Sequence, residues 1–123
     1  MKILLTILFA ATPVFCEPQA HGNILSAAQL EQAVLQEPGN ASLYLQLGFA
    51  YSNLQKVDEA QAAFETVIRL DPSKDAAYFM LGLIYEKKGL KEKAIAAWKA
   101  YLELETVPHM REKALKHLHN LQN

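Results

Sequence analysis

Residues 41–54 read ASLYLQLGFAYSNL, and residues 75–88 read DAAYFMLGLIYEKK. Each stretch has a Tyr, a Leu-Gly pair and a second Tyr at the same places, and the two stretches are offset by 34 residues. The match extends without a gap over residues 41–74 and 75–108. The matched pairs are Tyr44 with Tyr78, Leu47 with Leu81, Gly48 with Gly82, Tyr51 with Tyr85, Ala60 with Ala94, and Phe64 with Trp98. A fixed period of this length, with two helices in each unit, predicts a solenoid in which neighbouring units supply each other's core.

The sequence around this repeat is also helical. Apolar residues recur at helical spacing, and no run alternates apolar and polar residues as a half-buried strand does. Pro38 and Pro72 each end a helix, because proline lacks a backbone N–H and its ring clashes with the preceding turn. Ser26 and Gln29 form the S-x-x-Q pattern of a capping box. The predicted fold class is therefore all-α, with helices at 26–37, 41–54, 58–70, 75–88, 92–105 and 109–121.

The repeated residues resemble the tetratricopeptide repeat family, whose 34-residue unit has a large residue, Leu-Gly, Tyr, Ala, an aromatic residue and Pro in that order. The first unit has all seven, as Tyr44, Leu47, Gly48, Tyr51, Ala60, Phe64 and Pro72. The second unit departs at its end, where Thr106 replaces the proline and Pro108 follows. The resemblance implies a right-handed α-α superhelix of antiparallel helix pairs. It divides the chain into an N-terminal half-repeat helix at 21–40, repeat 1 at 41–74, repeat 2 at 75–108 and a C-terminal capping helix at 109–123.

The two motif glycines are predicted to serve helix packing. Gly48 and Gly82 would let the first helix of each pair approach the second with no side chain between them, and Ala60 and Ala94 are small for the same contact. The aromatic residues would then fill the wedge that opens away from this contact. A glycine inside a helix costs about 0.5–1 kcal/mol relative to alanine, so its presence at the same place in both units indicates a packing role.

A second stripe on the first helix of each unit is the candidate binding surface. Leu45 and Phe49 share one helical face, and Phe79 and Leu83 repeat it. The resemblance implies that this face lines an inner groove that holds a peptide or a helix. The predicted groove residues are Leu45, Phe49, Ser52, Phe79, Leu83 and Glu86, with Lys113 and His117 at one end.

The chemistry of this stripe limits the class of partner that the groove could bind. Some family members hold a C-terminal carboxylate with basic residues on this face, but here those places are mostly Leu and Phe. An apolar groove instead suits an amphipathic helix or an extended apolar peptide. Two alternatives stay open: the chain's own residues 17–25 cover the stripe, or a second copy does, which would make the groove a homodimer interface.

Residues 1–20 have the layout of a secretory signal peptide. Lys2 gives a positive start, residues 3–11 are continuously apolar, and Pro13 leads into small or polar residues. The apolar run is much shorter than the roughly 20 residues that cross a membrane as a helix. Cleavage is expected near residue 16 or 20, which would leave a chain without cysteine and without stable membrane insertion. We therefore expect export to the periplasm of a bacterial envelope, or secretion.

The net charge and the remaining sequence patterns argue against other classes of function. A formal net charge of -1 and a pI near 6.4 give no general attraction for nucleic acid. The four histidines, His21, His109, His117 and His119, do not have metal-ligand spacing, and no nucleophile–base pattern or phosphate-binding loop is present. The sequence therefore predicts no cofactor and no enzyme. It favours a non-catalytic module that binds another protein.

Overall fold

The computed structural model describes residues 24–123, and these residues form six helices and no strands. The helices are α1 (Ala27–Gln36), α2 (Ala41–Asn53), α3 (Val57–Leu70), α4 (Asp75–Lys87), α5 (Lys91–Leu104) and α6 (Pro108–Gln122). The all-α class is confirmed, and the predicted helices differ from the observed ones only at their ends. The predicted signal peptide and its cleavage points lie outside the described residues. Within residues 24–123, no helix has the length and hydropathy needed to cross a membrane.

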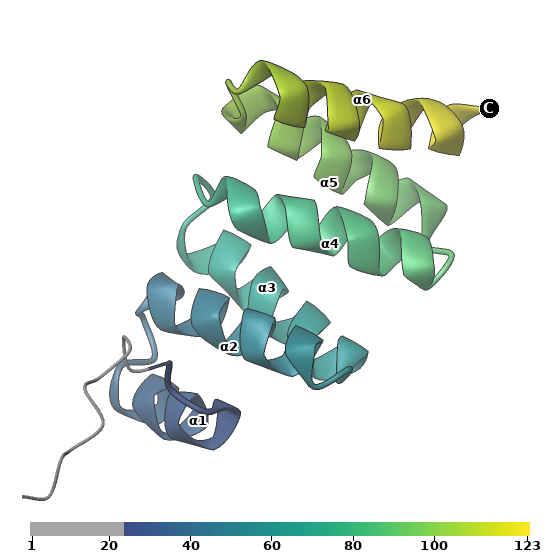
Figure 1. Cartoon of the computed structure of the whole chain (residues 1–123). Helices are drawn as coiled ribbons and strands as arrows, with labels where there is room; N and C mark the ends of the chain where they lie inside the picture. The colour runs from purple at the N-terminus through teal and green to yellow at the C-terminus, as the bar shows by residue number, and fades with distance from the viewer. Residues whose placement is uncertain (1–23) are drawn as a thin grey trace, which may run out of the picture.

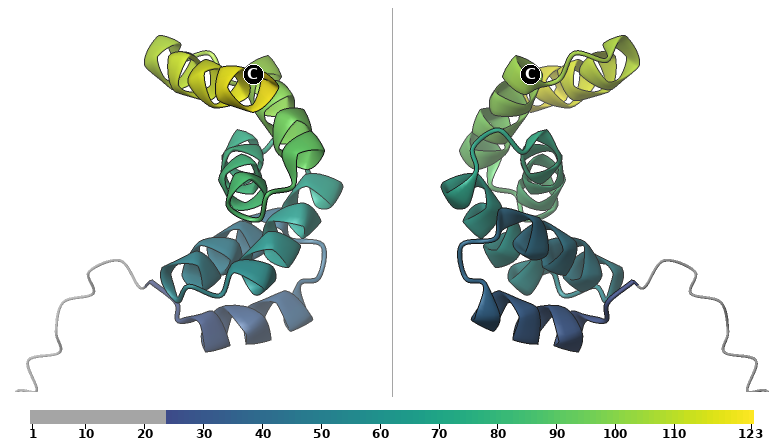
Figure 2. Two further views of the ribbon diagram at one scale, coloured as in Figure 1. Left: turned by 90° about the vertical axis from the view of Figure 1, so that its right-hand side faces the viewer. Right: turned by 90° about the vertical axis from the view of Figure 1, so that its left-hand side faces the viewer.

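The helices stack in chain order as antiparallel pairs (Figure 1). Helix α2 packs on α3, and α4 packs on α5, while α1 and α6 close the two ends of the stack against α2 and α5. Helices α2, α4 and α6 form one layer, and α1, α3 and α5 form the other (Figure 1). Figure 2 shows that the stack is curved, with α2, α4 and α6 along its hollow side. The fold is a tetratricopeptide-like solenoid.

Local chemistry explains where the helices begin. The hydroxyl of Ser26 accepts a hydrogen bond from the N–H of Gln29, and the side chain of Gln29 accepts one from the N–H of Ser26, so the predicted capping box is confirmed. Asn40 caps α2 by accepting from the N–H groups of Ser42 and Leu43. Pro108 opens α6, where the proline's missing N–H needs no helical partner.

The turn inside each helix pair uses a left-handed residue. Gln55 has φ 60° after α2, and Gly89 has φ 72° at the matching place after α4. Glycine adopts this conformation without strain, whereas a side chain with a Cβ does so at a cost. The two repeats therefore make the same turn, but only repeat 2 has a glycine at the left-handed position.

The buried core follows the repeat pattern. Of the residues assigned to repeat packing, Pro72 is exposed in its loop, and Tyr44, Tyr51 and Tyr78 are half-buried. The other nine are buried: Leu47, Gly48, Ala60, Phe64, Leu81, Gly82, Tyr85, Ala94 and Trp98.

The contact at the two motif glycines differs from the expectation. A Cβ atom added to Gly48 would lie 2.6 Å from Cε1 of Phe64, and one added to Gly82 would lie 2.6 Å from Cε2 of Trp98. The prediction that no side chain separates the helices at the glycines is therefore wrong. The aromatic ring of the second helix lies directly over the glycine, because the missing side chain leaves room for it. Both rings are fully buried.

A repeated hydrogen bond joins consecutive units. The Tyr51 hydroxyl donates to Oε1 of Glu31 at 2.7 Å, and the Tyr85 hydroxyl donates to Oε1 of Glu65 at 2.7 Å. Both bonds run from the first helix of one unit to the second helix of the unit before it. These hydrogen bonds thus repeat from unit to unit, as the apolar core residues do.

Candidate peptide-binding groove

The predicted groove residues on α2 and α4 are not equally accessible. Leu45 is half-buried and packs against the core between the two repeats, and Leu83 is half-buried against the core around Trp98. Phe49 is the open member of the stripe, with 39% of its surface exposed. The Ser52 hydroxyl donates to the carbonyl of Gly48 at 2.9 Å, so it is occupied within its own helix. The stripe is thus less exposed than a simple helical face would be.

A pocket of about 320 Å³, which we call the Phe49–Phe79 pocket, lies at the centre of this face. Its walls come from α2, α4, the end of α5 and α6. The lining residues are Phe49, Asp75, Ala76, Phe79, Met80, Tyr101, Glu105 and Met110. Most of this lining is apolar, and its two methionines have flexible side chains that adapt to different apolar ligands.

Buried aromatic rings hold the two phenylalanines in place. Phe49 meets Phe64 edge to face, with ring centroids 5.3 Å apart and an interplanar angle of 78°. Phe79 meets Trp98 in the same way at 5.3 Å and 89°. Such pairs add to the stability that area burial gives. The same rings that fill the space over the motif glycines therefore support the pocket wall.

Two further hollows adjoin this pocket. One of about 150 Å³ shares Met80 and extends along α4 to Leu83 and Lys87. The other, of about 330 Å³, shares Phe49 and is bounded by Ile24 and Leu25 before α1. Each of the two hollows thus borders the Phe49–Phe79 pocket at one shared residue. Of the segment that we considered as a cover, residues 17–23 lie outside the described residues.

Six of the eight pocket residues were not among the predicted groove residues. Asp75, Ala76 and Met80 lie on α4 beside the predicted Phe79, whereas Tyr101, Glu105 and Met110 come from α5, its C-cap and α6. Tyr101 carries the only usable signal, because it is a large aromatic residue where repeat 1 has Val67. Glu105 and Met110 reach the pocket only through the packing of α5 and α6 beside α4.

The two residues predicted at the groove's end have different places in the structure. Lys113 is exposed on α6. His117 is half-buried and stacks on Trp98, with ring centroids 4.5 Å apart and an interplanar angle of 17°. Its Nδ1 lies 2.8 Å from Oε2 of Glu86, and Trp98 Nε1 donates to the same oxygen at 3.3 Å. Glu86 and His117 therefore tie α4 to α6 and leave little of either group free for a ligand.

Two carboxylates stand at the edge of the Phe49–Phe79 pocket. Glu105 accepts from the N–H of Val107 at 2.7 Å and from the Tyr101 hydroxyl at 2.8 Å. These two hydrogen bonds favour the ionised form and lower the pKa of Glu105 below its usual value. Asp75 opens α4, where the helix dipole favours a negative charge.

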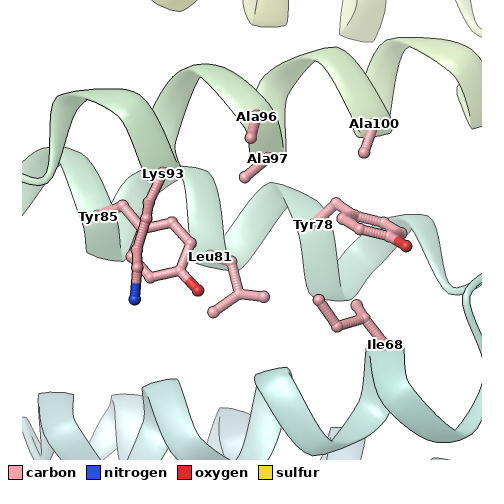
Figure 3. Close-up of a pocket in the computed structure, with 8 residues that line it drawn as sticks. All are labelled: Ile68, Tyr78, Leu81, Tyr85, Lys93, Ala96, Ala97 and Ala100. Carbon is pink, nitrogen blue, oxygen red and sulfur yellow. The ribbon is translucent and has the colours of Figure 1, made fainter.

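A separate pocket of about 360 Å³ lies between α3 and α5, with α4 as its floor (Figure 3). Figure 3 shows alanines of α5 above and Ile68 of α3 below, with Tyr85 and Tyr78 of α4 at the two sides between them; the alanines are Ala96, Ala97 and Ala100. It opens on the layer of second helices, away from the groove. Small alanine side chains of α5 leave this gap between consecutive repeats, and no exposed aromatic residue lines it.

In the described residues, no group of three or more His, Cys, Asp or Glu side chains is arranged to hold a metal ion.

The described residues form a curved helical-repeat solenoid that presents a largely apolar groove on its hollow side. The model of the tetratricopeptide repeat family matches residues 45–106, which is just over half of the chain. The chain belongs to the tetratricopeptide repeat (TPR) family.

Solved TPR domains have the same fold. The TPR domain of Arabidopsis OM64 is 20% identical, with a TM-score of 0.68, over 77% of this chain and 76% of that one. The first TPR of Spaghetti (RPAP3), bound to the HSP90 peptide SRMEEVD, is 22% identical with a TM-score of 0.68, over 78% and 74%. The second TPR domain of human RPAP3, in complex with the HSP70 peptide SGPTIEEVD, is 23% identical with a TM-score of 0.67, over 79% and 78%. No curated protein matches this sequence.

Proposed function

We propose that this protein is a non-catalytic interaction module that holds an apolar peptide or an amphipathic helix of another protein in its groove. The observation that carries the proposal is the Phe49–Phe79 pocket, which keeps an exposed aromatic ring at the centre of the hollow side. Exposed apolar surface of this kind marks interaction sites in soluble proteins. Two of the structural neighbours are complexes with peptides, which supports the same general role.

We propose further that the protein acts outside the cytoplasm. The support is the sequence of residues 1–20, with its basic start, apolar run and polar end. Fractionation of the producing cell, followed by N-terminal sequencing of the mature protein, tests this. A mature chain that begins after residue 16 or 20 supports export, and a cytoplasmic chain that begins at Met1 contradicts it.

Capture of the partner by groove variants tests the binding role. Phe49→Glu and Phe79→Glu place a charge in the pocket, and both variants are expected to lose the bound protein. Leu70→Glu is the matched control, because Leu70 has the same 39% exposure as Phe49 but does not line the groove. Circular dichroism checks that all three variants are folded. If folded Phe49→Glu and Phe79→Glu keep the partner that the wild type and Leu70→Glu hold, the groove is not the binding site.

Self-association is the alternative that the same variants separate. Light scattering of the purified chain is expected to show a monomer. A dimer that Phe49→Glu dissociates and Leu70→Glu does not would make the groove a homodimer interface instead.

A further inference from the structure

The edge of the Phe49–Phe79 pocket carries charge of one sign. Of its eight lining residues, only Asp75 and Glu105 are charged at neutral pH, and both are acidic. They belong to different helices, Asp75 to the first turn of α4 and Glu105 to the cap of α5. The packing of α4 on α5 therefore gives an apolar pocket an anionic edge.

Among the residues that the structure describes, no ion pair involves Asp75 or Glu105. Within residues 24–123, the ion pairs involve the carboxylates of Asp58, Asp71, Glu86 and Glu112. Arg111 lies close to Glu105, but its guanidinium donates to the backbone carbonyls of Leu102 and Glu105. These hydrogen bonds satisfy backbone carbonyls at the C-terminal end of α5.

Hydrogen bonds fix the position and the charge of one of the two groups. The N–H of Val107 and the Tyr101 hydroxyl each donate to a different oxygen of Glu105. Burial raises the pKa of Tyr101, and the Glu105 carboxylate and the charge of Asp75 raise it further. Both negative charges therefore act on one phenol at the back of the pocket.

A partner that fills such a pocket needs apolar and cationic groups side by side. An apolar side chain would enter between Phe49 and Phe79, and a neighbouring ammonium or guanidinium would reach the carboxylates at the edge. An acidic segment would place like charges together, which disfavours binding. The peptides in the two RPAP3 complexes end in Glu-Glu-Val-Asp, so their charge is opposite to what this edge would accept.

We propose that the groove selects a segment in which an apolar anchor lies next to Lys or Arg, and that it rejects acidic segments. This selectivity rests on the proposed function, because it assigns a partner chemistry to the same groove. The apolar walls supply most of the binding, and Asp75 and Glu105 supply the discrimination.

Calorimetric titration with two designed peptides tests the selectivity. Both are amphipathic helices of about 18 residues with the same Leu and Phe face, and one carries Lys where the other carries Glu. The Lys peptide is expected to bind about tenfold more tightly at low salt, and added salt should shrink the difference.

Charge-removing variants assign the effect to the pocket edge. The double variant Asp75→Asn/Glu105→Gln is expected to lose the preference, while it keeps the pocket's apolar walls. The control is Glu92→Gln/Glu103→Gln, which makes the same change in net charge at exposed carboxylates away from the pocket. A control variant that loses the preference equally would show a general effect of net charge and would overturn the proposal.

The outcomes also separate this inference from the proposed function. If wild-type protein binds both peptides equally, or binds the Glu peptide more tightly, the inference is wrong and the groove remains a binding site. If neither peptide binds the folded protein, the inference and the proposed function both fail.

Discussion

At the scale of single residues, the fold depends on pairs in which a glycine faces an aromatic ring. Gly48 makes room for Phe64, and Gly82 makes room for Trp98. The sequence alone indicated that the glycines mattered, because they recur at the same place. It did not indicate that a ring would lie over them, since a repeat period records which positions are equivalent but not which ones touch.

Gly48→Ala tests this packing with the smallest change. The new Cβ would lie 2.6 Å from the Phe64 ring, so the ring or the helix must shift. We expect a loss of about 1–2 kcal/mol in the free energy of unfolding, because overpacking outweighs the gain in helix propensity. Urea denaturation measures it. Gly39→Ala is the matched control, since nothing lies within 4 Å of its added Cβ, and Gly48→Ala/Phe64→Leu should recover part of the loss. Equal stability of Gly48→Ala and Gly39→Ala would contradict the packing.

The turn residues give a second prediction at this scale. Gln55 holds φ 60° where repeat 2 has Gly89. Gln55→Gly should therefore raise stability by about 0.5–1 kcal/mol, because glycine adopts the left-handed conformation without steric cost. The thermal midpoint measures the change. Gly89→Gln should shift the midpoint in the opposite direction. If both variants have a lower midpoint than the wild type, the left-handed conformation at this turn is not the cause of the difference.

At the scale of helices, consecutive units are joined by hydrogen bonds from a tyrosine to a glutamate. Hydrogen bonding to Glu31, burial, and the charges of Glu31 and Glu59 raise the pKa of Tyr51 to about 12. The neutral phenol is thus favoured in the folded state. Its contribution to stability is complete below the ordinary tyrosine value of 10.0, and it is lost as the pH rises through about 12.

This linkage predicts a particular effect of Tyr51→Phe. The variant should be less stable than the wild type at neutral pH, and the gap between them should narrow between pH 10 and 12. Urea midpoints measured across that range test it. Glu31→Gln, which removes the charge of the acceptor, should shift the alkaline loss of stability to lower pH. A gap that stays constant from neutral pH to pH 12 would rule out the linkage.

The helices also show what could be predicted and what could not. Boundaries at Pro38, Pro72 and the Ser26 capping box follow from local chemistry, which a sequence states directly. The place of His117 does not, because it depends on how α6 packs against α4 and α5. This packing stacks the imidazole on Trp98 and brings its Nδ1 to Glu86. Likewise, the pocket edge needs Asp75 and Glu105 to meet across two helices.

At the scale of the whole molecule, two complete helix pairs and a half repeat at each end form one curved stack. Each repeat buries its core against its neighbours, so the inner face is what remains available to a ligand. The solenoid class followed from the period in the sequence. The depth of the groove did not, because it depends on how far Leu45 and Leu83 turn into the core while Phe49 stays exposed.

The central claim is that another protein occupies this groove. Photo-cross-linking tests it most directly, with a photoreactive phenylalanine placed at residue 49 or, for comparison, at residue 70 of the full chain in the cell that produces it. The two positions have the same exposed fraction, 39%, and only residue 49 lines the groove. We predict one discrete partner cross-linked from position 49 and none from position 70. Cross-linking that is equal at both positions, or absent from position 49 in the folded protein, would contradict the account.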